Sequence, residues 1–408
     1  MRILIISNNE ISYNPRLLKA ADYFSQQGAE VFVFNPIVGI GTEEVYNNAT
    51  ANKGWQVFEN NISKRTFTSK VKWFYVSIIQ SLSRKLYKYA GIRFMYDAFL
   101  NKGLIGHSID VKKKYDFILI NLVDNLPFAV KLKKKTGAKI IYDSQEYFVG
   151  QYQKYDPIQL KWVMEAEKEN IRQVDILIAT TNAMKDQLEN DYQLTIPSFR
   201  VRNVPSEKML PKSTNRVKND AVVYLVWHGM TIFLENARGV HFLLEAVART
   251  KANVQLVLQG FINEEQKILL DKYITRLSLH GKVILKPAAH PYEIISSLTN
   301  YDIGLIGELA EEDNQRLTSS NKLFDYLHAG LAVIAPDLPG LNETIKENGI
   351  GLTYQVADTD SLAQAIESLA SDKHLLFEYK QKAYKTATEE MSWEKEYSFV
   401  WEKMKELV

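Results

Sequence analysis

The sequence predicts an α/β protein of two doubly wound domains, each built on a parallel sheet with helices on both faces. Three observations lead to this prediction: the chain length, the alternation of apolar runs with amphipathic segments, and one aperiodic break. The 408 residues are too many for one ordinary core and suit two domains. Hydrophobic residues make up 46% and charged residues 24%, as in a soluble globular protein.

Short β-branched runs alternate with amphipathic stretches along both halves of the chain. Near-continuous apolar strands separated by helices are typical of parallel sheets that are buried on both faces. The expected strands are residues 2–7, 29–34, 116–120, 139–143 and 175–180 in the first half, and 222–229, 253–260, 282–286, 302–307, 331–336 and 351–354 in the second. Amphipathic segments such as residues 14–28 and 239–250 supply the helices.

A polar stretch without periodicity, Ser206 to Asp220, separates the two series, and we interpret it as a linker. The first domain is therefore expected at residues 1–205 and the second at residues 206–389. A last helix is expected from Ser392 to Val408. Because open parallel sheets bind ligands at the carboxyl ends of their strands, we expect the active site in a cleft between the domains.

Two common nucleotide-binding signatures do not occur in this sequence. The first strand ends in Ser7-Asn8-Asn9-Glu10 instead of Gly-x-Gly-x-x-Gly, and no other strand is followed by that fingerprint or by a P-loop. These observations argue against a classical dehydrogenase and against a P-loop NTPase.

The sequence also bears on compartment. It contains no Cys, which excludes disulfides and thiolate metal sites. Met1 leads directly into an apolar strand, and no apolar window of about 18 residues occurs. We therefore expect neither a secretion signal nor a spanning helix, and a cytoplasmic location.

Residues 53–114 form a strongly basic segment. They carry 13 Lys or Arg residues against Glu59, Asp97 and Asp110, a net charge of +10. The segment also contains aromatic and aliphatic side chains, among them Trp73 and Phe74. Such a segment can lie on an anionic membrane surface. The alternative is a solvated helix pair whose apolar side packs on its own domain.

The stretch SSNKLFDYLHAG, residues 319–330, predicts a short helix with a polar start. Ser319, Ser320 or Asn321 is the expected N-cap. The free N–H groups of a helix start bind phosphate, and Lys322 adds a cation beside them. One turn later, Asp325 can accept hydrogen bonds from two adjacent ribose hydroxyls. These features indicate a nucleotide site; the alternative is a capped helix with an exposed Lys-Asp pair.

Several segments, in the same order along the chain, resemble GT-B glycosyltransferases of retaining family 4. The segments are SNNEISYNPRLLKAADYFSQQGAEVFVF for the opening strand, loop and helix, IYDSQEYF for an Asp-x-His-Glu segment, VRNVP for the hinge, NARGVHFLLEAVA for the first donor-domain helix, NKLFDYLHAG with LAVIA and LPGLNETI for the nucleotide signature, and SWEKEYSFVWEKM for the closing helix. The resemblance implies two Rossmann-like domains facing across a cleft. It also implies that the C-terminal helix, within residues 390–408, crosses back to the first domain.

The resemblance implies a set of site residues. The donor-binding residues would be Gly229, Ala288, Ser319, Ser320, Asn321 and Asp325. Arg238 and Lys322 would stabilise the leaving diphosphate and would form the catalytic set together with Glu146. The acceptor-binding residues of the first domain would be Asn9, Arg16, Asp143 and Gln145. For Arg16, capping of local backbone is an alternative role.

The sequence departs from the family pattern at two positions. The family often has a Glu eight residues before the ribose carboxylate, where this chain has Leu317. Four upstream acids either replace it or form a solvated loop: Glu308, Glu311, Glu312 and Asp313. Gln145 stands where many relatives have His, and Gln can hydrogen-bond but cannot shuttle a proton. His228 and His328 are expected to be packed or hydrogen-bonded structural residues.

The implied activity is that of a hexosyltransferase that needs no metal and no cofactor. It would move a sugar from a nucleotide-diphospho sugar to a glycan or lipid-linked acceptor, with retention, in surface polysaccharide or glycoconjugate synthesis. It would act at the inner face of a membrane, which the basic segment 53–114 could contact, and nucleic acid is not an expected partner. The alternatives are a non-catalytic nucleotide- or glycan-binding GT-B protein and a nucleotide-sugar epimerase.

Overall fold

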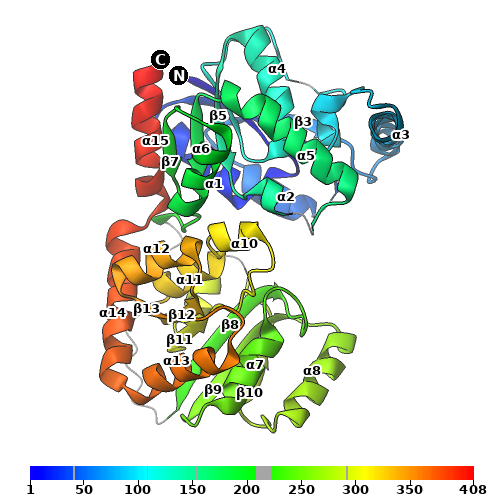
Figure 1. Ribbon diagram of the computed structural model, residues 1–408. Helices are drawn as coiled ribbons and strands as arrows, with labels where there is room; N and C mark the ends of the chain where they lie inside the picture. Colours follow the sequence, from blue (N-terminus) through cyan, green and yellow to red (C-terminus); the bar gives the residue numbers. More distant parts are fainter. Residues whose placement is uncertain (40–41, 108, 152–153, 208–221, 291–292) are drawn as a thin grey trace. The chain divides into compact units, whose positions relative to one another are not determined.

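The computed structural model describes the chain except for residues 40–41, 108, 152–153, 208–221 and 291–292 (Figure 1). The described residues form two compact units. The first unit comprises residues 1–180, 184–201 and 396–408, and the second comprises residues 181–183 and 202–395. Most of the predicted linker lies outside the described residues.

The boundaries of the units differ by a few residues from those expected. The N-terminal part of the first unit ends at Val201 rather than at residue 205, and the second unit continues to Lys395 rather than to residue 389. Val204 and Met391 explain both differences, because each is fully buried in the core of the second unit.

The first unit contains a seven-stranded sheet in which all neighbouring strands are parallel. Its strands lie in the order β3 (Gln56–Asn61), β2 (Glu30–Ile37), β1 (Arg2–Ile6), β4 (Phe117–Ile120), β5 (Lys139–Ser144), β6 (Ile176–Ala179) and β7 (Ser198–Arg200). The five strands predicted for this half are confirmed. The two additional strands, β3 and β7, lie at the edges of the sheet, where most side chains are only partly buried or exposed.

Helices connect these strands. The α-helices are α1 (Pro15–Gln26), α2 (Glu43–Thr50), α3 (Phe67–Ala90), α4 (Leu126–Thr136), α5 (Pro157–Asn170), α6 (Asn182–Tyr192) and α15 (Trp393–Leu407); the 3-10 helices are η1 (Ile11–Tyr13), η2 (Tyr96–Ala98), η3 (Lys102–Leu104), η4 (Val123–Asn125), η5 (Phe148–Gly150) and η6 (Ile171–Gln173). The ring of Tyr397 in α15 lies 5.5 Å from that of Phe24 in α1. The C-terminal helix therefore returns to the first unit, as predicted.

The second unit contains a six-stranded parallel sheet. Its strands lie in the order β10 (Val283–Lys286), β9 (Val254–Phe261), β8 (Val223–Thr231), β11 (Ile303–Leu305), β12 (Ala332–Pro336) and β13 (Gly351–Tyr354). All six are predicted by the sequence. The helices are α7 (Val240–Arg249), α8 (Glu264–Arg276), α9 (Ile294–Leu298), α10 (Asp313–Leu317), α11 (Asn321–His328), α12 (Pro339–Asn348), α13 (Thr359–Ser371) and α14 (Lys373–Glu390).

Helices cover both faces of the second sheet, as the apolar strands predict. Leu225 and Trp227 of β8 pack in one apolar layer with α7, α8 and α13. Val226, between them in sequence, packs in the opposite layer with α9, α11 and α12. This alternation follows from the two-residue period of a strand. Full burial of one such side chain stabilises the folded state by about 1.5–3 kcal/mol. Because β8 buries side chains on both faces, both helical layers contribute to holding it in place.

The order of strands places a topological switch point in each sheet. In the first sheet, β1 lies between β2 and β4; in the second, β8 lies between β9 and β11. In each sheet, the connections that leave the two central strands, β1 and β4 or β8 and β11, run to opposite sides. This arrangement opens a crevice at the carboxyl ends of these strands. Residues that follow β8 and β11 are therefore placed to form a ligand site.

Candidate functional site

The loops that follow β8 and β11 in the second unit pack backbone against backbone. Gly239 has a φ of +66°, and a Cβ at this position would lie 2.1 Å from the carbonyl oxygen of Gly307. The N–H of Leu309 donates to the carbonyl oxygen of Ala237 at 3.1 Å. Only glycine fits this close approach, which brings together the residues next to the two glycines, Arg238 and Glu308.

Four side chains meet beside these loops, and we call them the Glu308 cluster: Arg238, Glu308, Ser320 and Lys322. The Oε1 atom of Glu308 accepts hydrogen bonds from Ser320 Oγ at 2.9 Å and from Lys322 Nζ at 3.2 Å. The guanidinium of Arg238 lies 3.6 Å from the same oxygen. The structure therefore brings together Arg238 and Lys322, the two predicted cationic residues. Glu308, one of the four acids of the upstream loop, contacts both of them.

The charges of this cluster differ in exposure. Lys322 is 5% exposed and Glu308 is also buried, whereas the side chain of Arg238 is 59% exposed. Burial opposes ionisation of Glu308, but Lys322 and Arg238 outweigh it and hold the pKa of the carboxyl below its usual value. Burial lowers the pKa of Lys322, and Glu308 partly offsets this effect. The exposed Arg238 is thus the cation that can most easily change partners.

The cluster lies at the start of helix α11. Ser320 is the N-cap residue and was one of the three predicted candidates, but its side chain makes no capping hydrogen bond. Its hydroxyl donates to Glu308 instead. The first backbone N–H groups and the positive end of the helix dipole, with Lys322 beside them, suit an anion such as phosphate.

Asp325 lies one turn further along α11. Its Oδ2 is 3.4 Å from Nε2 of His228, which follows Trp227 on β8. Burial, with a smaller contribution from Lys322, lowers the pKa of His228 to about 3, so the imidazole is neutral near pH 7. The His228 ring also packs edge-on against Tyr326, at 5.2 Å between centroids. His228 is thus a packed residue that faces the carboxylate predicted to bind ribose.

Two other predicted donor residues have different surroundings. A Cβ at Gly229 would lie 2.7 Å from the Trp227 ring, so the neighbouring side chain by itself favours glycine at this position. Ala288 is exposed and follows β10. Two strands, β9 and β8, lie between β10 and β11 in the sheet. At about 4.8 Å per strand, this distance keeps Ala288 apart from the Glu308 cluster.

Several buried polar atoms at the carboxyl ends of these strands have no hydrogen-bond partner among the described residues. They are Trp227 Nε1, Gln259 Oε1, Glu308 Oε2 and Ser319 Oγ. Native proteins leave few buried polar atoms unsatisfied. Their concentration at one edge of the sheet, beside two cations and a helix start, is the pattern expected of a site for a polar, anionic ligand.

In the first unit, Arg16 and Asp143 form a buried ion pair. Arg16 donates through Nε and a terminal nitrogen to both oxygens of Asp143, each at 2.8 Å, and also to the carbonyl oxygen of Val201 at 2.9 Å. Tyr397 donates to Asp143 at 3.3 Å. The predicted acceptor-binding role requires exposed side chains, and these two are 2% and 0% exposed. Their burial favours a structural role that joins α1, β5 and α15.

Other polar residues gather at the carboxyl edge of the first sheet. Asn9 follows β1, and Gln145 and Glu146 follow β5. Asp124, which sequence reasoning missed, lies in η4 after β4. Burial raises the pKa of Asp124 to about 6, against the effect of a hydrogen bond with Asn8. Glu146 belongs to this unit, whereas Arg238 and Lys322 belong to the second.

Unsatisfied polar atoms mark this edge as well. They are Asn8 Oδ1, Asn9 Oδ1, Ser12 Oγ, Asn121 Oδ1 and Gln145 Nε2. Within the described ranges of the chain, no group of three or more His, Asp or Glu side chains is arranged to hold a metal ion.

The fold is similar to that of several solved structures over the whole chain. A glycosyltransferase from Rickettsia africae has a TM-score of 0.68 at 15% identity, covering 100% of this chain and 98% of that one. HepE of Anabaena, in complex with UDP and glucose, has a TM-score of 0.66 at 14% identity, covering 100% of both chains. Sucrose-phosphate synthase from Thermosynechococcus elongatus has a TM-score of 0.69 at 13% identity, covering 100% and 99%. With its two parallel sheets, the chain has the GT-B fold.

Residues 223–372 match the family model of "Glycosyl transferases group 1". These residues extend from β8 through α13 and include the whole Glu308 cluster and Asp325. The match lies within the second unit and confirms the resemblance to GT-B glycosyltransferases. No curated protein matches the chain in sequence.

Proposed function

We propose that this protein transfers a sugar from a nucleotide-diphospho sugar, which its second unit binds. The observation that carries the proposal is the Glu308 cluster at the start of α11, inside the group 1 domain. HepE, which shares the fold, has been crystallised with UDP and with UDP-glucose, and this supports a nucleotide sugar as the donor.

The chemistry of such a transfer requires stabilisation of the leaving diphosphate. Arg238, Lys322 and the start of α11 would face the negative charge as it develops on the phosphate oxygens. Glu308 holds the two cations at one place, and the exposed Arg238 moves from it to the phosphate. Asp325 would accept hydrogen bonds from the ribose hydroxyls. We take retention of configuration, with an oxocarbenium-like transition state, from the family resemblance.

The acceptor is a glycan or a lipid-linked sugar bound at the carboxyl edge of the first sheet. Asn9 and Gln145 present unsatisfied amide atoms there. Asp124 adds a carboxylate whose pKa, raised by burial to about 6, makes it a suitable base near neutral pH. These groups would hydrogen-bond the hydroxyls of the acceptor. The product would serve surface polysaccharide or glycoconjugate synthesis.

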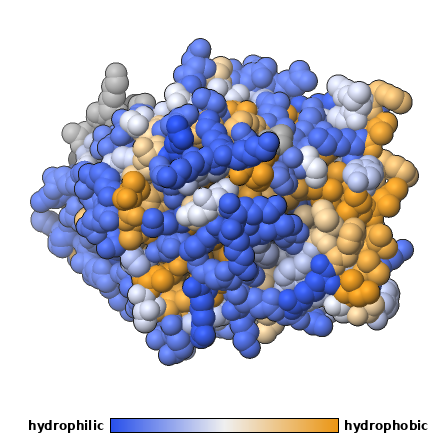
Figure 2. All heavy atoms as spheres, turned by 90° about the horizontal axis from the view of Figure 1, so that it is seen from above, coloured by the Kyte–Doolittle hydropathy of each residue, from blue (hydrophilic) through white to orange (hydrophobic). Residues whose placement is uncertain are grey.

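Helix α3 supports action at the inner face of a membrane. Its exposed apolar residues are Phe67, Val71, Phe74, Tyr75, Ile78, Leu82 and Tyr89. Most of them recur every three or four positions, and Lys70, Lys72 and Lys85 are interspersed. Figure 2 shows apolar side chains gathered at the right edge of the view, on the side where Figure 1 places α3. No helix in the described part of the chain combines the length and apolarity needed to cross a membrane.

Thermal unfolding with UDP, GDP, ADP and CMP tests the donor proposal. We expect one nucleoside diphosphate to raise the Tm, and Asp325→Ala to remove the effect because the ribose loses its acceptor. Asp313→Ala, an exposed acid at the start of α10, is the control that keeps the response. Release of the diphosphate from its sugar conjugate then separates an enzyme from a non-catalytic binding protein. The absence of any response at millimolar nucleotide would contradict the proposal.

A further inference from the structure

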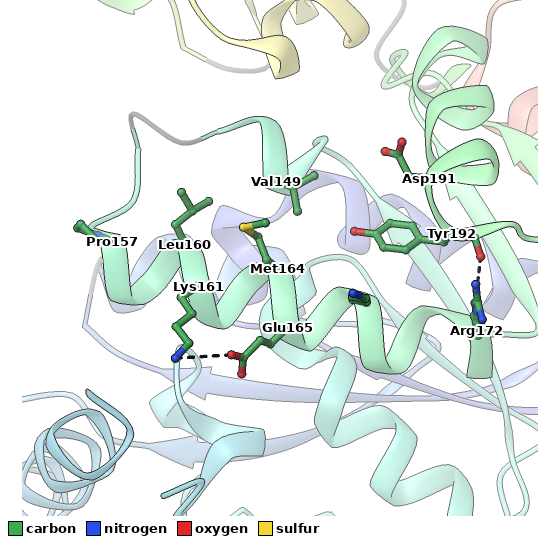
Figure 3. A pocket seen from close by; sticks show the side chains of 10 residues that line it. Val149, Pro157, Leu160, Lys161, Met164, Glu165, Arg172, Asp191 and Tyr192 are labelled. Atoms are coloured by element: carbon green, nitrogen blue, oxygen red, sulfur yellow. Dashed lines mark hydrogen bonds and ion pairs between the residues drawn. The ribbon is translucent and has the colours of Figure 1, made fainter. Parts of the chain in front are cut away.

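A pocket of about 810 Å³ lies on helix α5 of the first unit, apart from the sites described above (Figure 3). Its apolar lining includes Val149, Leu160, Met164 and the ring of Tyr192. In Figure 3, Leu160 and Met164 extend from α5 toward Val149 and the Tyr192 ring. The volume is within the range of small-molecule sites, about 300–1,000 Å³. Met164 is 51% exposed, so the apolar surface is open to solvent.

The rim of this pocket is cationic. Lys161, Lys168 and Arg172 line it, together with two acids, Glu165 and Asp191. Glu165 is shared between cations, since Arg93 donates to it at 2.9 Å and Lys161 lies 3.8 Å away. Asp191 accepts hydrogen bonds from Tyr147 at 2.7 Å and from Gln187 at 2.7 Å. Lys168 and Arg172 thus give the rim positive charge beyond what the acids neutralise.

The pocket adjoins the membrane-facing helix proposed above. The ammonium of Lys161 lies 5.4 Å from the ring of Tyr87, which belongs to α3. Tyr87 packs against Phe99, and Phe99 stacks on Trp162 of α5 at 5.5 Å. A continuous set of contacts therefore links α3 to the helix that forms the floor of the pocket.

We propose that this pocket binds the hydrocarbon chain of a lipid phosphate, whose phosphate group lies at the Lys168 and Arg172 rim. The inference rests on the proposed function, because such a lipid would be the anchored part of the sugar acceptor. An apolar floor requires a hydrocarbon, a cationic rim requires an anion, and the adjoining helix α3 supplies the route from a bilayer. A lipid phosphate combines these three properties.

The test is NMR of the full chain labelled at its methionine methyl groups, titrated with decyl phosphate below its micelle concentration. Met164→Leu assigns the reporter signal. Met230, 88% exposed in the second unit, is the matched control for non-specific effects. We expect decyl phosphate to shift the Met164 signal saturably and to leave the Met230 signal unchanged. Inorganic phosphate has the anion without the hydrocarbon chain, and decyl maltoside has the chain without the anion. Each should bind at least about tenfold more weakly than decyl phosphate, a difference of about 1.4 kcal/mol.

Variants test the floor and the rim separately. Leu160→Asp should weaken decyl phosphate binding by about tenfold, whereas Leu269→Asp, at an exposed position on α8, should not change it. Lys168→Gln and Arg172→Gln should each weaken binding by about two- to fivefold, and added salt should do the same. Retained signals of the buried Met184 and Met404 show that each variant is folded.

Three results would overturn the inference. They are an unchanged Met164 signal, equal binding of decyl maltoside, and a Met164 signal that changes with protein concentration alone, which would indicate a second copy of the chain. Because the measurement needs no nucleotide, each result is distinct from a failure of donor binding.

Discussion

Lys322 and Glu308 lie 3.2 Å apart in a buried ion pair of the second unit, and the exposed Arg238 approaches the same carboxylate oxygen. A buried ammonium of this kind is costly without a counter-ion, because burial removes its hydration. Glu308 supplies that counter-ion in the ligand-free structure. A bound diphosphate would supply a second anion to Lys322 and would take Arg238 from Glu308.

The first prediction concerns the coupling between these two residues. Glu308→Gln should destabilise the protein by about 3–5 kcal/mol, because Lys322 stays buried without a carboxylate. The double variant Glu308→Gln/Lys322→Met should cost less than the sum of the single variants. Urea unfolding of the four proteins measures the coupling free energy. The same cycle on the exposed pair Glu378 and Lys382, 2.7 Å apart, should give about 0.5 kcal/mol or less. Equal coupling in the two cycles would contradict the structural role of Glu308.

The second prediction compares two ion pairs of equal length in the first unit. Arg16 and Asp143 are buried at 2.8 Å, and Arg2 and Glu30 are exposed at 2.8 Å. Arg16→Met should lower the free energy of unfolding by about 3–5 kcal/mol, because Asp143 remains buried without its partner. Arg2→Met should cost less than about 1 kcal/mol. If both variants are equally stable in urea, or if Arg16→Met weakens only acceptor binding, the acceptor role predicted from the sequence regains support.

The third prediction concerns Glu167, a buried residue that accepts hydrogen bonds from Tyr142 at 2.9 Å and from Tyr192 at 2.8 Å. Burial raises the pKa of this carboxyl to about 7, against the effect of the two hydroxyl groups. The folded state therefore holds a proton over the window from about pH 4.5 to pH 7 in which the unfolded state has lost it. Stability should fall as the pH rises through this window, by up to about 3 kcal/mol.

Urea unfolding at about pH 5 and pH 8 checks this sign. Glu167→Gln should remove the Glu167 contribution to the decrease, because the amide does not titrate. Glu389→Gln, at an exposed position on α14, should retain it. A Glu167→Gln protein that loses as much stability with rising pH as the wild type would contradict the assignment.

The strands were predictable where the sheet is buried on both faces, because such strands are nearly continuous apolar runs. All eleven predicted strands are present. The two that were missed are edge strands: β3 reads QVFENN and β7 has only three residues. An edge strand can lack an apolar run, as these two do, and hydrophobicity then gives no signal for it. The edge strands of the second sheet, β10 and β13, were predicted from VILK and GLTY.

From the residues alone, without the family resemblance that indicated Arg238, the candidate site was predictable only where it is contiguous in sequence. Ser320, Lys322 and Asp325 occupy one short helix, so their spacing alone indicated a phosphate and ribose site. The choice of Glu308 among four neighbouring acids depends on how the loop folds beside Gly239. The Arg16 and Asp143 pair, separated by 127 positions, carries no local signal at all. Burial of these two residues, which decides their role, is a tertiary property.

The fourth prediction concerns the exposed apolar face of α3. Wild-type protein should float with vesicles that contain phosphatidylglycerol and less with neutral vesicles, and added salt should weaken binding. Phe74→Glu/Ile78→Glu should reduce the bound fraction by about tenfold, because both apolar contacts are lost. Ile268→Glu/Leu269→Glu changes two exposed apolar residues of α8 and should bind as the wild type does. Absence of wild-type binding, or equal loss in the control, would contradict membrane contact through α3.

Calorimetric titration of Arg238→Gln with the nucleoside diphosphate that stabilises the wild type tests whether the Glu308 cluster binds the diphosphate of a nucleotide sugar. Arg238 is largely exposed, so its loss leaves the fold intact. Arg249→Gln, at the other end of α7, is the matched control, since that guanidinium pairs with Asp360 at 2.8 Å. We expect Arg238→Gln to weaken binding by about tenfold or more and Arg249→Gln to have no effect. If the two variants bind the diphosphate with equal affinity, the Glu308 cluster is not the diphosphate site.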